Sequence, residues 1–508
     1  MSSHPPRGRP VELIWLKRDL RLRDHAPLAE AAARGPVLCL YVYEPELMAH
    51  PTTHAAHLDF INASLAELDA ALRARGGGLV TRVGDLPDVL DRLHAQRPIA
   101  RLWSHEETGL GITYERDKRV KRWCREQGIE WIELPNHGVF RPHAGRDGWS
   151  ARWRRRMAEP IRAEPAHIDG VLDLPSAGLQ SAADLGVAGT PRPDAVSAGI
   201  ACGRAVLADF LAKRSRAYQG DISSPVTAWS GSSRLSPHLA WGNLSVREVY
   251  QATAARIAQL KAMPEREAQD WARSLTSFAK RLHWHCHFIQ KLEDQPDIEF
   301  RNLSRACDGL RDERPDTALL DAWRHGQTGY PMVDACMRAL AAGGWVNFRM
   351  RAMLMSFAAY HLWQHWREPA LHLARLFLDF EPGIHFSQAQ MQSGTTGINA
   401  VRIYSPVKQV RDHDPQGVFI RRWCPELALV PDAYLPRPET MPAHIQQAAG
   451  CVIGRDYPAP IVDNGKAWFR ARQRMGALRA RAEARSEARQ IHHRHGSRRR
   501  PQHLRTAR

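Results

Sequence analysis

The sequence lacks the short motifs that mark the commonest cofactor and metal sites. Its eight cysteines are scattered, and none forms a Cys-x-x-Cys pair, which removes the tight spacing typical of zinc and iron–sulfur centres. No G-x-G-x-x-G follows the first apolar segment, and no G-x-x-x-x-G-K-[ST] occurs anywhere. An obvious dinucleotide or NTP domain is therefore not indicated. We expect isolated, reduced thiols and no metal centre.

Long apolar runs are also missing. No run is long enough to cross a bilayer, and the first ten residues have no apolar region of the kind a signal peptide needs. The chain has 508 residues, of which 44% are hydrophobic and 25% charged, as is typical of a globular protein with two or three domains. We therefore expect a cytoplasmic monomer without a membrane partner.

The positive charge is concentrated at one end. The formal net charge is +17, but Arg470 to Arg508 alone carries 13 arginines against two glutamates. That segment contributes +11, so the rest of the chain is only mildly basic. A basic tail is either a solvated segment or a source of phosphate affinity, and both interpretations stay open. We expect residues 476–508 to be a disordered basic tail.

The first part of the chain alternates short apolar segments with helical patterns. An apolar stripe at three- and four-residue spacing runs from Leu58 to Leu72, as in an amphipathic helix. Such alternation predicts an α/β domain, with a doubly wound parallel sheet, over residues 1–140. The segments expected as strands are 11–16, 37–43, 79–84, 100–106 and 130–135.

The composition then changes twice. The chain becomes rich in Pro, Ala, Gly and Ser, which is typical of a connection between domains, and we assign 141–200 to a linker. After Ala201 the strand patterns largely disappear and helical periodicity takes over. We expect an all-helical domain over 201–475.

The stretch WSGSSRLSPHL, residues 229–239, raises the question of a phosphate site. Ser236 followed by Pro237 predicts a helix N-terminus, and serine hydroxyls with an arginine beside it suit a phosphate. From the residues alone, that phosphate could belong to a cofactor, to a nucleic acid, or to neither.

Two further stretches allow more than one interpretation. Histidines alternate in RLHWHCHF (281–288), which would suit a metal site on a strand, but in a helix such residues do not share a face. In 376–409, Asp379 and Glu381 lie beside aromatic residues and need a donor if they are to stay ionised. Arg349 and Arg351 are the candidate donors, in a pair that could be functional or purely structural.

These motifs together resemble the photolyase/cryptochrome flavoproteins over nearly the whole chain. The matching segments are LIWLKRDLRLRDHAPL (13–28), SSRLSPHL, GQTGYPMVDACMRAL (326–340), the Asp379–Glu381 segment, RIYSP and FIRRWCPELALVP (419–431), in family order. The resemblance implies an N-terminal α/β domain and a helical domain that holds a folded FAD. It also implies that the phosphate is the cofactor's.

The family's site residues carry over as follows. The resemblance implies that Arg351 keeps Asp379 ionised beside the isoalloxazine and that Trp284 lines a lesion pocket. The residues expected to bind FAD are Tyr218, Ser232, Ser233, Arg234, Leu235, Ser236, His285, Phe348, Arg351, Asp379, Phe380 and Glu381. Those expected to take part in catalysis are Trp284, Arg281, Asn347 and Trp366.

The chain departs from the family at several of these positions. Trp284-His285-Cys286 stands where photolyases of the usual type have Trp-Arg-Glu, and Arg281 stands where they have a lesion-contacting glutamate. The asparagine next to flavin N5 falls at Phe348, or at Asn347 after a one-residue shift. We choose Asn347, because an amide can hydrogen-bond N5 and a phenyl ring cannot.

The electron-carrying tryptophans and the second chromophore match less well. Trp366 matches the middle member of the family's three-tryptophan chain, the flavin-proximal member falls near Ala389, and the outer one has no counterpart. A second, antenna chromophore often occupies the N-terminal domain of this family. Residues 104–117 lie in a suitable region, but they match loosely and we assign no antenna residue.

Two functions follow from the resemblance. The first is blue-light-driven repair of pyrimidine dimers, by electron transfer from reduced FAD to a flipped-out lesion in single- or double-stranded DNA. The second is a cryptochrome-type photoreceptor without repair activity. Trp284 and the basic tail favour repair, whereas Arg281 and the missing tryptophans favour the sensor. A flavin or nucleic-acid-binding protein that does not use light is a third alternative.

Overall fold

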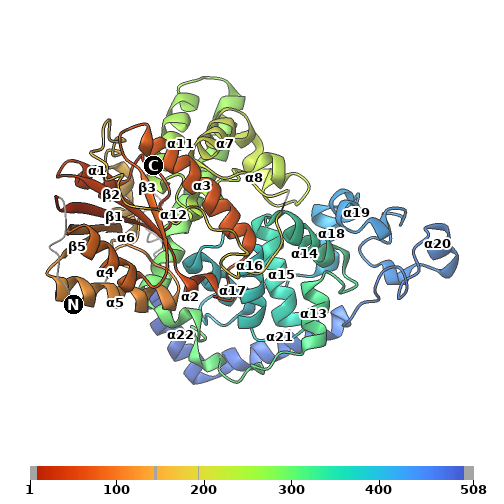
Figure 1. The fold of residues 1–508 in the computed structure, drawn as a ribbon. Helices are drawn as coiled ribbons and strands as arrows, with labels where there is room; N and C mark the ends of the chain where they lie inside the picture. The colour runs from red at the N-terminus through yellow and green to blue at the C-terminus, as the bar shows by residue number, and fades with distance from the viewer. Residues whose placement is uncertain (1–8, 142–145, 193, 497–508) are drawn as a thin grey trace.

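The structure, a computed structural model, describes residues 9–141, 146–192 and 194–496. The N-terminal domain contains a five-stranded sheet with all neighbouring strands parallel, in the order β3-β2-β1-β4-β5 (Figure 1). The segments predicted as strands are these strands, shifted by at most a residue at either end. They are β1 (Val11–Leu16), β2 (Val37–Tyr43), β3 (Leu79–Val83), β4 (Ile99–His105) and β5 (Glu130–Leu134).

Helices cover both faces of this sheet, which confirms the doubly wound α/β prediction. Alternate residues of β1 point to opposite cores: Ile14 packs with α1 and α3, and Leu13 packs with α4 and α5. Because both faces are buried, the strands are continuously apolar rather than alternating. The helices up to residue 158 are α1 (Ala26–Ala32), α2 (Pro45–Met48), α3 (Ala55–Arg73), α4 (Leu86–Gln96), α5 (Gly111–Gln127) and α6 (Trp149–Ala158).

The segment predicted as a linker begins with α6 and is then mostly irregular up to residue 199. It lies against the first domain, since Ile168 and Val187 are buried in the core beneath β2 and α3. Asp169 and Val171 also hydrogen-bond the backbone of Val37 at the start of β2. The connection is therefore docked along the α/β domain.

The second domain is helical, as predicted, and its longest helix is α12 (Arg266–Asp294). No described helix combines the length and the hydropathy that a membrane span requires. The other elements up to residue 448 are α7 (Ile200–Ala212), η1 (Arg214–Ala217), α8 (Tyr218–Asp221), α9 (Ala228–Gly231), α10 (Ser236–Ala240), α11 (Val246–Lys261), η2 (Pro296–Glu299), η3 (Arg305–Cys307), α13 (Thr317–Arg324), α14 (Pro331–Gly343), α15 (Phe348–Ser356), η4 (Phe357–His361), α16 (Arg367–Leu376), α17 (Pro382–Ser393), α18 (Pro406–His413), α19 (Val418–Trp423), η5 (Pro425–Leu427), η6 (Pro438–Thr440) and α20 (Ala443–Ala448).

Two glycines allow the close approaches that shape the sites. Gly242 has φ +77°, and a Cβ there would lie 2.3 Å from the backbone oxygen of Arg18. Gly383 lets α17 pack directly on α12, since a Cβ would lie 2.6 Å from the Cα of Ile289. A side chain at either position would push apart the elements that carry the candidate site residues.

The expected disordered tail is wrong for residues 476–496. These residues form the end of α21 (Asn464–Ala480) and all of α22 (Ala482–His495), and the remaining residues of the predicted tail lie outside the described ranges. Leu478 and Ile491 are buried, and the Glu487 carboxylate accepts hydrogen bonds from Ser304 Oγ, Arg305 N and Ala306 N. The prediction of disorder relied on the high arginine content of the segment. It overlooked the few apolar residues, which are spaced so that they face the domain in a helix.

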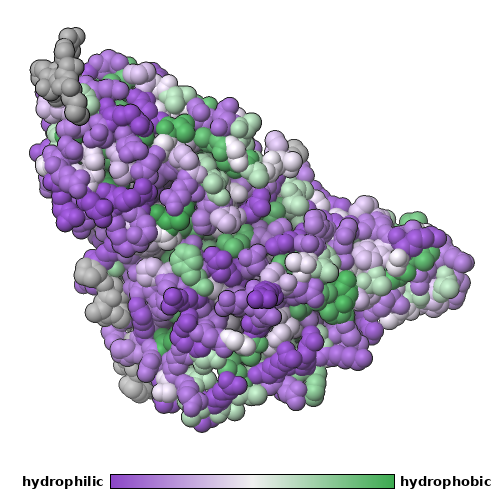
Figure 2. Space-filling view, turned by 60° about the horizontal axis from the view of Figure 1, so that its bottom comes forward, coloured by the Kyte–Doolittle hydropathy of each residue, from purple (hydrophilic) through white to green (hydrophobic). Residues whose placement is uncertain are grey.

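Figure 2 brings the face with α21 and α22 forward and shows it to be mostly hydrophilic. The arginines of these helices are largely exposed, for example Arg472, Arg474 and Arg485. The basic character of the segment therefore lies on the outer side of packed helices.

Candidate functional site

The predicted phosphate stretch is a loop held from behind by an arginine. Arg214 donates to the backbone oxygens of Ser232 and Ser233. These bonds fix the two carbonyls. Arg234 has a left-handed φ of +54°, and its guanidinium stands over the Trp229 ring. The loop leads into α10, where Leu235 is the N-cap and Ser236 the first helical residue, one position earlier than the sequence suggested.

Tyr218 lies on α8, packed edge-to-face on Phe210 and Phe278. Burial raises the pKa of the Tyr218 phenol to about 12, and a hydrogen bond with Arg281 opposes that rise. Arg281, which was expected to face a lesion, is thus in contact with Tyr218. The two residues tie α8 to α12.

Arg351 and Asp379 form the pair that the sequence proposed. Two hydrogen bonds of 2.8 and 2.9 Å join the guanidinium to both carboxylate oxygens, and Arg351 Nε donates to Val346 O at 2.8 Å. The guanidinium also lies 4.2 Å from the centre of the Phe377 ring. The Asp379 side chain is 3% exposed and that of Arg351 is 21% exposed. A bidentate pair of this kind fixes the orientation of both side chains.

Asn347 and Phe348 differ sharply in their surroundings. Asn347 is buried at the start of α15, and its Nδ2 donates to Ile222 O and Ser223 O at 3.0 and 3.1 Å. Phe348 is 48% exposed. Of the two residues between which the alignment was ambiguous, Asn347 is the one held in a defined orientation inside the domain.

Segment 281–288 is helical, and its histidines point to different partners. His283 contacts Trp149, His285 lies beside His137, and His287 packs against Trp284. This arrangement excludes a shared metal for the three. Burial lowers the pKa of His285 to about 4, so its ring is neutral. His285 faces the loop after β5 of the first domain.

Trp284 and Trp366 occupy opposite environments. Trp284 is 40% exposed, with one side of its ring against Phe288. Trp366 is fully buried, and its Nε1 donates to Asn302 Oδ1 at 2.9 Å. Ala389, at the position of the family's flavin-proximal tryptophan, is buried on α17.

Several buried polar atoms around these residues have no hydrogen-bond partner within the described part of the chain. Buried polar groups are normally satisfied, and a group of exceptions needs an explanation such as a polar ligand. These atoms lie on the phosphate loop, at the start of α15 and on α17, which directly follows the Asp379–Glu381 segment. They are Ser232 Oγ, Arg234 Nε, Asn347 Oδ1, Arg349 Nε and Ser387 Oγ. The residues present therefore fit a long polar cofactor such as FAD.

Phe380 and Glu381 connect this region to the first domain. Arg18 donates to Phe380 O and lies 4.0 Å from the Glu381 carboxylate. Burial raises the pKa of Glu381, and the Arg18 charge opposes that rise. Phe380 also lines a cavity that reaches into the α/β domain.

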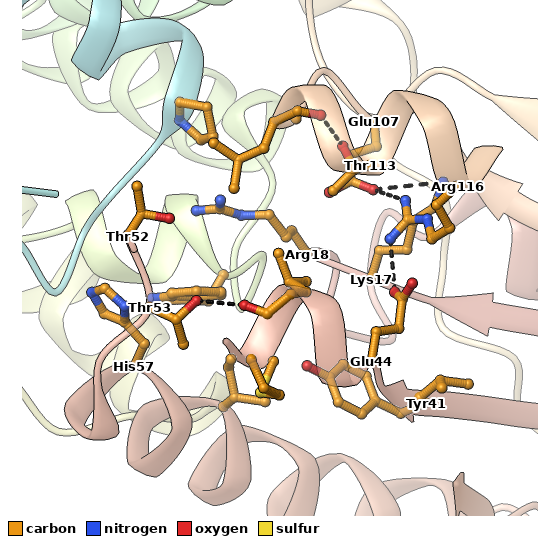
Figure 3. Close-up of a pocket in the computed structure, with 18 of the residues that line it drawn as sticks. Lys17, Arg18, Tyr41, Glu44, Thr52, Thr53, His57, Glu107, Thr113 and Arg116 are labelled. Carbon is orange, nitrogen blue, oxygen red and sulfur yellow. Dashed lines mark hydrogen bonds and ion pairs between the residues drawn. The ribbon is translucent and has the colours of Figure 1, made fainter. Parts of the chain in front are cut away.

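That cavity was not assigned from the sequence (Figure 3). It lies at the carboxyl ends of β1, β2 and β4, on the side where ligands bind in open parallel sheets. Lys17 Nζ stands 4.1 Å from the centre of the Trp15 ring, and Arg18 stands 4.4 Å from that of Trp241. The sequence feature that could have indicated this cavity is the polar residues that directly follow the apolar strands, such as Lys17, Arg18 and Glu44.

Segment 104–117, considered for an antenna chromophore, contributes to the wall of this cavity. Arg116 is bound by three carboxylates, those of Glu44, Glu107 and Asp117, at 2.6 to 2.8 Å. Thr113 stands beside Glu107 on the same wall (Figure 3). The cavity is also lined by the apolar side chains of Leu47, Met48, Leu58 and Ile61.

Asp19, His25 and His105 form the one His/Asp cluster of metal-site dimensions in the described ranges. His105 Nδ1 and His25 Nε2 lie 2.6 and 3.1 Å from Asp19 Oδ2. His25 Nδ1 accepts the Leu28 N–H, so the hydrogen of the neutral ring must sit on Nε2, directed at Asp19. A metal ion on Nε2 would require a His25 ring with no hydrogen on either nitrogen, because Nδ1 already accepts a hydrogen bond. The cluster is a hydrogen-bond network.

Comparisons with known proteins agree with this geometry. Residues 12–150 match the family model of DNA photolyase, and residues 278–477 match that of the FAD binding domain of DNA photolyase. The chain is 29% identical to a deoxyribodipyrimidine photo-lyase of Halobacterium salinarum (90% of this chain, 97% of the relative). It is 28% identical to cryptochrome-1 of Arabidopsis thaliana (90% of this chain, 69% of the relative).

A solved structure gives the same result for the fold. The crystal structure of a bacterial class III photolyase from Agrobacterium tumefaciens superposes with a TM-score of 0.80 at 26% identity, covering 94% of this chain and 99% of that one. The two matched models together span the α/β domain and most of the helical domain. The chain therefore belongs to the photolyase/cryptochrome family and contains that family's FAD-binding domain.

Proposed function

We propose that this protein repairs pyrimidine dimers in DNA, driven by blue light and dependent on reduced FAD. The observation that carries the proposal is the placement of Trp284. It is a 40% exposed tryptophan, one helical turn from the Arg281 that contacts Tyr218. A half-exposed indole at the edge of a cofactor site is a platform on which an extruded pyrimidine can stack.

We assign the residues of this chain the following roles in FAD binding and repair. Bound FAD supplies the photoexcited electron donor. The loop at Ser232–Ser236 holds the diphosphate, while Arg351 and Asp379 orient the ring. Trp284 stacks on the lesion and excludes water from its face. Arg281 can donate to a pyrimidine carbonyl oxygen whose negative charge grows after electron transfer, if it exchanges Tyr218 for the lesion.

A cryptochrome-type photoreceptor without repair activity is the second candidate. It is favoured by Arg281, a cation engaged with Tyr218 at a position where repair enzymes of the usual type carry a glutamate. A photolyase and a cryptochrome also match this chain at nearly equal identity.

An illuminated repair assay separates the two candidates. The fully reduced protein is mixed with oligonucleotides that carry either a cyclobutane or a (6-4) dimer, in single- and double-stranded form, and dimer reversal is followed by chromatography. Repair of at least one substrate, absent in the dark, is the expected result. A reduced, illuminated protein that binds flavin and reverses none of the four substrates would leave the photoreceptor as the function.

We further propose that the cavity of Figure 3 holds a second, planar aromatic chromophore that passes energy to FAD. Support comes from its aromatic walls beside cationic groups. Met48→Trp, which fills the cavity, should remove a second absorbing species from the purified protein while FAD content is unchanged. Identical spectra before and after the change would contradict a bound chromophore there.

A further inference from the structure

Glu299 is a buried carboxylate of the helical domain that contacts a wall of the cavity in Figure 3. It is the last residue of η2, and its side chain is 2% exposed. Its Oε2 accepts the N–H of Gly111, the first residue of α5, at 2.7 Å. Leu110, directly before it, lines the cavity and is buried in the core of the helical domain. The segment that leads into α5 is therefore fixed to the second domain, although it belongs to the first.

The loop after α2 faces the other oxygen of the same carboxyl group. His50 Nδ1 accepts the Thr52 N–H at 3.3 Å, so the hydrogen of the neutral ring is on Nε2. Nε2 lies 4.0 Å from Glu299 Oε1. Burial, together with the charge of Arg367, lowers the pKa of His50 to about 4, so the ring is neutral near pH 7. Thr52 lines the cavity too. One carboxyl group thus faces two cavity walls that are far apart in the chain.

The surroundings of Glu299 favour a neutral carboxyl group. Burial raises the pKa of Glu299 to about 7, and the Gly111 N–H and the Arg367 charge oppose that rise. Arg367 lies at the start of α16, and it is the one cation among the described residues that lowers this pKa. A neutral carboxyl group still accepts the Gly111 N–H through its carbonyl oxygen. In water, by contrast, a glutamate is ionised above about pH 4.3.

We propose that Glu299 is a latch that holds the two cavity walls against the helical domain, closed when its carboxyl group is neutral and released into water when it is ionised. The inference rests on the proposed function, in which the cavity holds a second chromophore. Glu299 is not among the described residues that line the cavity. It is a positioning residue, which acts through Gly111 and through the loop at His50.

Protonation of Glu299 should close the latch. Opening moves this group from a pKa of about 7 to its ordinary value near 4.3, so opening releases a proton between these two values. The closed form should gain up to about tenfold per pH unit as the pH falls through this window. His50 acts in the opposite sense below about pH 6.5, because its pKa is about 4 when packed and near 6.5 in water. A variant that keeps His50 and cannot titrate at position 299 isolates the carboxyl group.

Hydrogen exchange of the full-length protein measures the opening at the Gly111 amide and its neighbours. Wild type and variants are compared between about pH 5 and pH 8, and each rate is divided by the rate of an unstructured peptide. Glu299→Gln keeps an acceptor and cannot ionise, whereas Glu299→Ala has no acceptor. Asp297→Asn is the matched control, because it changes an exposed carboxylate on the same η2.

The protection of wild type relative to Glu299→Gln should rise more than tenfold as the pH falls from 7 to 5. Asp297→Asn should follow the wild type, and Glu299→Ala should be less protected than Glu299→Gln at every pH. A wild-type to Glu299→Gln ratio that does not change with pH would overturn the proposal. If Glu299→Gln did not fold, His50→Gln would decide, because Glu299 then titrates without the opposing histidine. Protection that did not rise with falling pH in His50→Gln would reject the latch.

This outcome is independent of the second chromophore. A pH-dependent ratio in a protein without a second absorbing species would support the latch and count against the chromophore. A constant ratio in a protein that retains such a species would do the reverse. Where the species is present, gel filtration at pH 8 should remove it faster from Glu299→Ala than from Asp297→Asn. Equal retention in these two variants would contradict a latch on this cavity.

Discussion

Arg351 and Asp379 are joined by two hydrogen bonds of 2.8 and 2.9 Å between α15 and the segment before α17. The carboxylate is buried, and the guanidinium has its third nitrogen on Val346 O. The arrangement is rigid and leaves neither charge unpaired.

Asp379→Ala should therefore abolish stable flavin binding. It leaves the Arg351 cation without a partner inside the domain, at a cost of roughly 3 kcal/mol, or more than 100-fold in affinity. Flavin content after purification and the dissociation constant for added FAD measure the effect. Asp432→Ala is the control, because it breaks the exposed pair with Arg421, which contributes little. Full flavin retention in Asp379→Ala would show that this pair is structural.

Trp284→Ala should weaken binding of dimer-containing DNA by roughly 1–3 kcal/mol, the value of one base–aromatic stack. Undamaged DNA of the same sequence should bind unchanged, since phosphate contacts are untouched. Trp468→Ala is a matched control, because Trp468 is 37% exposed but lies on α21. Equal affinity of wild type and Trp284→Ala for damaged DNA would contradict a lesion site at this tryptophan.

Glu487→Ala should release α22 from the helical domain. The carboxylate accepts hydrogen bonds from one hydroxyl and two backbone N–H groups, and these lose their partner at a cost of roughly 2 kcal/mol. Hydrogen exchange should rise in residues 482–495, while Glu483→Ala, at an exposed position, should leave it unchanged. Equal protection in both variants would mean that the buried Ile491 alone holds the helix.

Truncation after Gly496 tests the charge of the last twelve residues, which contain five arginines. The cut keeps α22 whole, so flavin content should not change. If these arginines bind phosphates, the slope of log affinity against log salt on duplex DNA should fall by about 0.9 for each phosphate that the shortened protein no longer neutralises. The same slope in both proteins would show that the segment does not bind DNA.

Acid should destabilise the protein between about pH 6.5 and pH 4. Burial lowers the pKa of His361 to about 4, against an ordinary value near 6.5 in the unfolded chain. The unfolded state therefore binds more protons in this window, and stability falls as the pH falls through it. His361→Gln should reduce the slope of the unfolding free energy against pH by at most about 1.4 kcal/mol per pH unit. Urea unfolding at several pH values between 4 and 6.5 measures this slope. An unchanged slope would mean that His361 is protonated in the folded state.

The sequence by itself determined the architecture. Continuously apolar strands that alternate with helices indicate a parallel sheet buried on both faces, and the stripe from Leu58 to Leu72 needs a core beneath it. The need of the buried Asp379 carboxylate for a donor was also predictable, with Arg349 and Arg351 as candidates, and the resemblance to the family selected Arg351. These features follow from local patterns, and the structure has each of them.

Other features depend on contacts between distant segments, which a local pattern cannot contain. Glu487 accepts hydrogen bonds from the Ser304 hydroxyl and the backbone N–H groups of Arg305 and Ala306, far away in the chain. Charge composition alone therefore predicted disorder where the structure has a packed helix. The cavity is lined by residues far apart in the chain, such as Arg18 and Trp241, and Gly242 admits the close approach of the Arg18 backbone. Glu299 contacts the first residue of α5 only because the two domains pack together. Hydrogen-bond partners, burial and cavities are properties of the packed chain, and only the tertiary structure decides them.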